Sequence, residues 1–120
     1  EVKGLTNMTT IRTAAALLAL AFAATAVAGP KGNAAAGKDK AEKVCAACHG
    51  ADGNKTLDNT YPRLAGQYAD YLEKAMRDYR SGKRKNAIMG AQAQPLTDKE
   101  IADVAAYYAA QKSEIHDLSH

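Results

Sequence analysis

Residues 44–50 of the chain read VCAACHG. Cys45 and Cys48 are the only 2 cysteines in the sequence, and His49 follows the second one directly. A C-x-x-C-H pattern is compatible with a thiol–disulfide couple, with part of a metal site, or with the covalent attachment of a haem. The rest of the sequence helps to choose among these three possibilities.

The beginning of the chain has the three parts of a secretory signal peptide. Arg12 supplies a positive charge, an uncharged apolar run covers residues 14–24, and an A-x-A cleavage site ends at Ala28. The run is shorter than the roughly 20 apolar residues that a transmembrane helix needs. We therefore expect residues 1–28 to be upstream residues and a cleaved signal peptide, so that residues 29–120 form one exported, periplasmic domain.

Size and charge limit what such a domain can do. The remaining chain is short enough for its core to be marginal, so we expect a disulfide, a metal or a cofactor to supplement it. The formal net charge of +3 is too small to indicate a nucleic acid as the partner.

The apolar pattern predicts helices and no strands. Tyrosine, leucine, alanine and methionine side chains recur at spacings of three and four between residues 67 and 80. Thr97 and Glu100 have the spacing of a capping box, with Leu96 and Ile101 placed as a hydrophobic staple. The expected helices are 38–48, 67–80 and 97–111, and the expected loops are 29–37, 50–65 and 83–95. We therefore predict an all-α domain with three or four helices and long loops.

The alternatives to haem attachment fit this context poorly. A disulfide between residues three apart closes a tiny loop and constrains little of the unfolded chain. A thioredoxin-like couple starts a helix after a strand, and no strand is predicted here. A zinc site needs about four ligands, and His49 adjoins Cys48 too closely to complete the same tetrahedron easily. The pattern therefore favours a c-type haem, bound by two thioether bonds and by the adjacent histidine.

On the opposite face of such a haem, the iron has one position left for a ligand. Met89 lies in an expected loop, 40 residues beyond His49, far enough for the chain to pass round the haem. Met76 belongs to the apolar face of a helix, and His116 and His120 lie in a polar tail. We expect Met89 to be the second axial ligand.

A histidine–methionine pair raises the potential of the iron and fills both axial positions, which suits electron transfer. An open position would instead make a haem-based sensor or a peroxidase-like enzyme plausible. A haem-free C-x-x-C thiol or zinc protein is the remaining alternative.

With these residues placed, the chain resembles the class I bacterial cytochromes c, in particular the single-haem domain of the cytochrome c4/c553 type. The resemblance covers roughly Ala34 to Gln111. It rests on four pieces in order: VCAACHG, YPRLAGQ at 61–67, YRSGKRKNAIMG at 79–90, and PLTDKEIADVAAYYA at 95–109. It implies the cytochrome c fold, with the helices wrapped around one covalently attached haem c, and an electron-carrying function.

The resemblance also implies roles for individual residues. Cys45 and Cys48 match the thioether positions, and His49 and Met89 match the axial ligands of the iron. Pro62 matches the proline whose carbonyl accepts the second N–H of the proximal histidine.

Three further positions concern packing. Leu64 matches an apolar residue against the haem face. Gly37 and Tyr107 match the contact where the first and last helices cross. Ala41 is smaller than the residue that the family often has in its first helix.

A run of basic residues just before Met89 suggests a docking surface. Lys83, Arg84 and Lys85 could steer an acidic redox partner toward the haem edge, or they could simply be a solvated helix end. We expect Tyr68, Tyr71 and Tyr79 to pack in the core and the haem pocket. We expect a monomer or a weak dimer.

Overall fold

The computed structural model describes residues 31–114, and every regular element within that range is helical. The all-α prediction is confirmed for this part of the chain. The expected leader, residues 1–28, lies outside the described residues. The elements are α1 Ala34–Lys40, the π-helical turn η1 Ala41–Cys45, α2 Ala46–His49, α3 Ala69–Ser81, α4 Ala87–Ala93 and α5 Asp98–Ala109.

The first helix begins earlier than the sequence suggested. The side chain of Asn33 accepts a hydrogen bond from the backbone N–H of Ala36 and so caps α1. Part of the segment predicted as the linker 29–37 is therefore helical, because this cap and an alanine run favour a helix. The helix continues through η1, whose wider turn leads directly into the cysteine motif.

The backbones of α1 and α5 come very close together where the two helices cross. A Cβ atom added to Gly37 would lie 2.0 Å from the carbonyl oxygen of Asp103, so only glycine permits this approach. The expected crossing of the first and last helices is confirmed, but the nearest atoms belong to the backbone of Asp103 and Val104. Tyr107, expected at the same crossing, is buried in the core cluster together with Ala41.

α4 corrects the prediction of a loop over residues 83–95. Asn86 caps a helix from Ala87 to Ala93 by accepting a bond from the backbone N–H of Met89 at 2.9 Å. Seven residues form only two turns, so the segment is too short to show a helical period in the sequence.

The predicted last helix and its capping box are confirmed. Thr97 and Glu100 form both bonds of the capping box at the start of α5. Apolar side chains of α5 then pack against α1 and α3. The core cluster consists of Ala41, Leu72, Val104, Ala105, Tyr107 and Tyr108.

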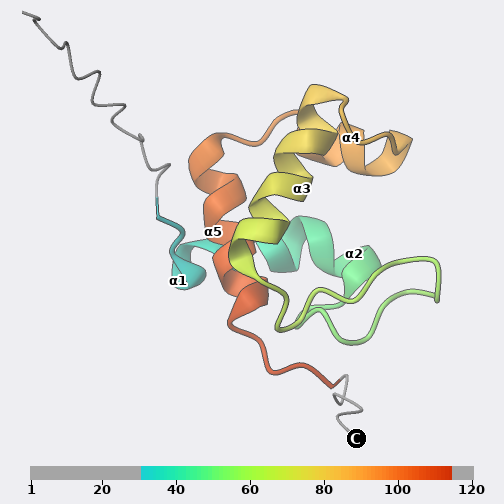
Figure 1. The fold of residues 1–120 in the computed structure, drawn as a ribbon. Coiled ribbons are helices and arrows are strands. Elements are labelled where there is room, and N and C mark those ends of the chain that lie inside the picture. The colour runs from blue at the N-terminus through green and yellow to red at the C-terminus, as the bar shows by residue number, and fades with distance from the viewer. Residues whose placement is uncertain (1–30, 115–120) are drawn as a thin grey trace, which may run out of the picture.

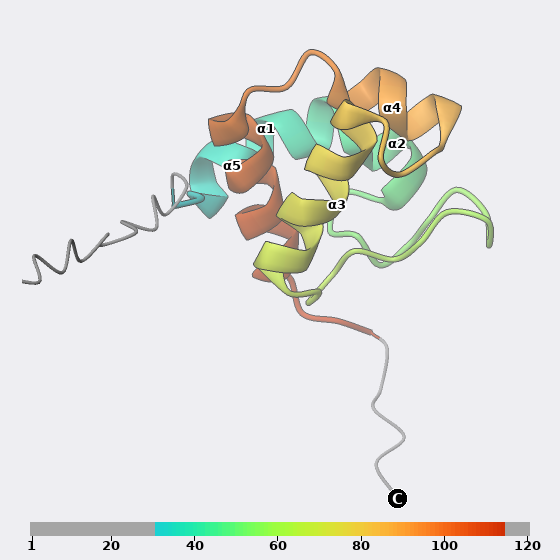
Figure 2. The ribbon, with the colours of Figure 1, turned by 45° about the horizontal axis from the view of Figure 1, so that its top comes forward.

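In both views of the ribbon, α5 lies on one side of α3, and α4, α2 and the loop after α2 lie on the other (Figures 1 and 2). The fold thus brings the cysteine motif and the short helix of Met89 to the same side of α3. No helix within residues 31–114 is long and apolar enough to cross a membrane.

Candidate haem site

Cys45, Cys48 and His49 lie at positions i, i+3 and i+4 of one helical stretch. Side chains at these spacings are neighbours on one face of a helix. Both thiols are free and half-buried, whereas His49 is only 6% exposed. Two thiols and an imidazole are therefore presented together on one face.

The orientation of His49 is fixed by a backbone oxygen. Its Nδ1 atom lies 2.9 Å from the carbonyl oxygen of Pro62. With the proton on Nδ1, the imidazole donates to that oxygen and keeps the lone pair of Nε2 free for a metal ion. The ring of Tyr61 packs edge-on against the imidazole, with the centroids 6.2 Å apart.

Cys45 has the surroundings of an uncharged sulfur. Burial raises its pKa to about 11, and it packs with Leu64 against the core cluster. A thiol of this kind stays protonated at neutral pH, which weakens its use as a nucleophile or as a zinc thiolate. An apolar wall suits a thioether, which carries no charge.

Two tyrosines of α5 hold the backbone that follows His49. The hydroxyl of Tyr107 donates to the carbonyl of Ala51 at 2.8 Å, and that of Tyr108 donates to the carbonyl of Gly50 at 3.2 Å. Burial raises the pKa of Tyr108, so its hydroxyl remains a donor. These bonds join the histidine motif to the most buried helix of the fold.

Asn54 is a further anchor of this loop, and sequence reasoning missed it. The side chain is 4% exposed. Its Nδ2 donates to the carbonyl of Lys112 at 3.0 Å, and its Oδ1 accepts from the N–H of Glu114 at 2.8 Å. Asp52 accepts two further bonds from Asn54. The sequence shows only that Asn54 is a turn-forming residue, because Lys112 and Glu114, which it bonds across the fold, are about sixty residues away.

Met89 and Met76 lie on different helices. Met89 is the third residue of α4 and is half-buried, and Met76 is a half-buried residue of α3. The tail histidines, His116 and His120, lie outside the described residues. Leu64, like Cys45, packs against the core cluster, while Pro62 is exposed and offers only its carbonyl to the site.

The tyrosines expected in the core are partly at the surface. Tyr68 is 78% exposed and Tyr71 49% exposed, so the prediction of core packing is wrong for these two. Tyr79 is half-buried and carries the guanidinium of Arg84 over its ring at 5.0 Å. Arg84 also donates to the hydroxyl of Tyr71 at 3.4 Å.

The basic residues before Met89 divide into two groups. Arg77 pairs with Glu73 at 3.2 Å, and Arg80 bonds to the carbonyl of Leu96 at 2.8 Å, so both have structural partners. Lys83, Arg84 and Lys85 are exposed.

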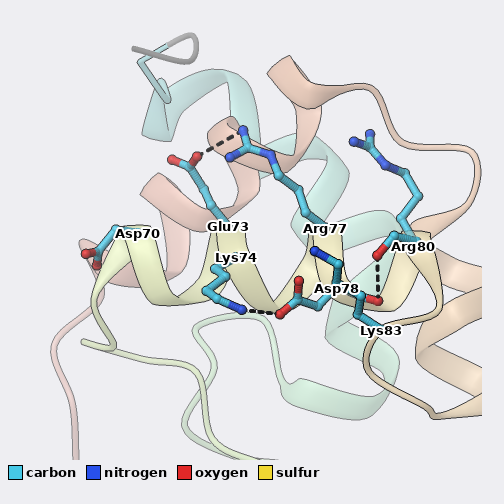
Figure 3. Close-up of a pocket in the computed structure, with 8 residues that line it drawn as sticks. Asp70, Glu73, Lys74, Arg77, Asp78, Arg80 and Lys83 are labelled. Atoms are coloured by element: carbon cyan, nitrogen blue, oxygen red, sulfur yellow. Dashed lines mark hydrogen bonds and ion pairs between the residues drawn. The ribbon is translucent and has the colours of Figure 1, made fainter. Parts of the chain in front are cut away.

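The outer side of α3 carries a separate surface pocket with charged walls. Figure 3 shows that its acidic and basic side chains pair with each other, as Glu73 with Arg77 and Lys74 with Asp78. It contains none of the predicted haem-site residues.

The donor set fits a covalently attached haem. Two free thiols stand three residues apart, and the adjacent imidazole has one nitrogen bonded to the carbonyl of Pro62 and one free. Thioethers and a neutral imidazole nitrogen need no counter-charge.

Comparison with known proteins agrees with this chemistry. Residues 34–111 match the family model described as Cytochrome c. Cytochrome c4 from Pseudomonas aeruginosa is 47% identical over 98 residues, which are 82% of this chain and 48% of that protein. Cytochrome c-554(548) from Halomonas halodenitrificans is 51% identical over 84 residues, which are 68% of this chain and 99% of that protein.

A solved structure supports the fold assignment. Reduced recombinant cytochrome c4 from Pseudomonas stutzeri aligns with a TM-score of 0.65 at 39% identity, covering 70% of this chain and 48% of that chain. The chain spans about half the length of these cytochrome c4 relatives. The expected all-α cytochrome c fold is confirmed.

Proposed function

This chain belongs to the cytochrome c family, and from that membership we propose that it carries single electrons between redox proteins on a covalently attached haem c. The observation that carries the proposal is the arrangement around His49. Two free thiols share its helix face, and the carbonyl of Pro62 fixes its ring. We further propose that a single domain over residues 29–120 holds one haem. In this proposal the protein is an electron carrier rather than an enzyme.

Haem c, when bound, supplies an iron that changes its charge by one electron. The residues of the chain prepare that change. Cys45 and Cys48 would anchor the group by thioether bonds, and His49 would ligate the iron through Nε2. The bond to Pro62 increases the basicity of the imidazole and prevents its rotation.

Met89 would supply the second ligand in the proposed site. Methionine favours the reduced iron and raises its potential. If His49 and Met89 both bind the iron, little room would be left for a substrate, which favours electron transfer over a sensor or a peroxidase-like enzyme. Met76 is the competing ligand, since it also lies half-buried on a neighbouring helix.

The partners in this proposal are redox proteins that dock near the haem edge. One relative, from Stutzerimonas stutzeri, is named as a thiosulfate dehydrogenase electron acceptor. Lys83, Arg84 and Lys85 would form an exposed basic rim next to α4 and would steer an acidic partner.

We also propose that the signal peptide directs export to the periplasm, and that the protein is a monomer or a weak dimer.

One optical spectrum tests the proposal. The full chain is expressed together with a c-type haem attachment machinery, and its visible spectrum is recorded in the oxidised and reduced states. A low-spin spectrum with a weak far-red sulfur-to-iron band supports histidine–methionine ligation. High-spin features would indicate a sensor or peroxidase-like site, and absence of visible absorption would indicate the thiol or zinc alternative.

A further inference from the structure

The helix that carries Met89 is too short to be stable alone. α4 has seven residues, including Gly90, and isolated helices of that length are not stable in water. Contacts outside its own backbone must therefore keep the methionine in place.

Asn86 supplies the first of these contacts. Its backbone is extended, with φ at −160°, and its Oδ1 accepts the backbone N–H of Met89 at 2.9 Å. The cap is thus bonded directly to the residue that the proposed function makes a ligand.

The other end of α4 is attached to α3. The Nε2 atom of Gln94 donates to the carbonyl of Arg80 at 2.7 Å. Ala93, one residue before Gln94, is fully buried. The C-terminal end is therefore fixed by packing and by a side-chain bond, whereas the start of α4 is exposed and depends on its cap.

We propose that Asn86 is a positioning residue: its side chain holds the backbone of Met89 so that the methionine stays at the haem iron. This inference rests on the proposed function. Loss of the cap increases the fraction of molecules in which the methionine has left the iron. An N-cap replaced by alanine changes such an equilibrium about fivefold.

Imidazole binding to the oxidised holoprotein measures that fraction. Imidazole can occupy the iron only when the methionine is detached, so its apparent dissociation constant falls as the detached fraction rises. Asn86→Ala should therefore bind imidazole about fivefold more tightly than the parent protein. Asn86→Ser, which keeps an acceptor oxygen, should restore the parent value.

Thr97→Ala is the matched control. Thr97 caps α5 by the same kind of bond, to the N–H of Glu100, but α5 carries no proposed ligand. This variant should lower the free energy of unfolding while leaving imidazole affinity unchanged. Equal effects of Asn86→Ala and Thr97→Ala on imidazole affinity would overturn the proposal, as would an unchanged affinity in Asn86→Ala.

A separate measurement distinguishes failure of this inference from failure of the proposed function. If the sulfur-to-iron band survives Met89→Ala, the ligand assignment itself is wrong. If Met89→Ala abolishes the band and Asn86→Ala leaves imidazole binding unchanged, only the role of Asn86 is wrong.

Discussion

The backbone N–H of Glu114 donates to Oδ1 of Asn54 at 2.8 Å, so the segment after α5 is fastened to the loop after the cysteine motif. Asn54 is also bonded to Asp52 and to the carbonyl of Lys112. The buried side-chain amide of Asn54 therefore joins the loop that follows His49 to the segment that follows α5.

Asn54→Ala should lower the free energy of unfolding of the holoprotein by about 1–3 kcal/mol, because it removes the three hydrogen bonds of a buried side chain. Asn59→Ala is the control, since Asn59 is an exposed residue of the same loop. Urea unfolding measures both variants. Equal stability of the two would show that the bonds of Asn54 contribute nothing.

Gly37→Ala should be among the most destabilising single changes. The added methyl would lie 2.0 Å from the carbonyl oxygen of Asp103, and the two helices would have to separate. We expect a loss of about 3 kcal/mol. Gly82→Ala, whose methyl would meet nothing within 4 Å, should lose only about 1 kcal/mol for its positive φ. Thermal unfolding compares the two, and a smaller loss for Gly37→Ala would contradict this account of the crossing.

Stability should depend on pH through Glu100 below about pH 4.5. The backbone N–H of Thr97, followed by Lys40, lowers the pKa of Glu100 from 4.5 to about 2. A group with a lowered pKa stabilises the fold above its unfolded pKa, and that stabilisation is lost as the pH falls. The free energy of unfolding should therefore decrease from about pH 4.5 toward pH 2.

Glu100→Gln tests this assignment, because it removes the titration while keeping an oxygen for the cap. The variant should be less stable than the parent at pH 7 and should approach it near pH 2. An unchanged acid dependence in the variant would show that other carboxylates cause it.

The double change Lys83→Glu and Lys85→Glu should slow reduction by an acidic electron-transfer protein, mainly at low ionic strength. Lys31→Glu with Lys38→Glu makes the same change of charge at the α1 end and should have a smaller effect. Stopped-flow measurements give the rate of reduction over a range of salt concentrations. If the rates do not change with ionic strength in any of these proteins, the basic residues do not form a docking surface.

Most of the fold could be predicted from the sequence where the signal is local. The capping box at Thr97 and the end of the helix predicted over 67–80 depend on neighbours within a few residues, and in the structure the box is present and α3 ends at Ser81. The face shared by Cys45, Cys48 and His49 follows from helical spacing alone.

Contacts between distant segments were not predictable in this way. Lys112 and Glu114, the distant partners of Asn54, are about sixty residues away, and nothing in the neighbouring sequence identifies them. α4 was missed because seven residues show no period, and its helix depends on Asn86 and on packing against α3. The carbonyl of Pro62 was expected only from the family resemblance, since any residue can offer one.

The proposed ligation of the haem iron by His49 and Met89 has a spectroscopic signature, the far-red sulfur-to-iron band of the oxidised holoprotein. This band can be compared in Met89→Ala and Met76→Ala. We expect it to be lost in Met89→Ala and kept in Met76→Ala. Loss of the band in Met76→Ala with its retention in Met89→Ala would contradict the proposed ligation.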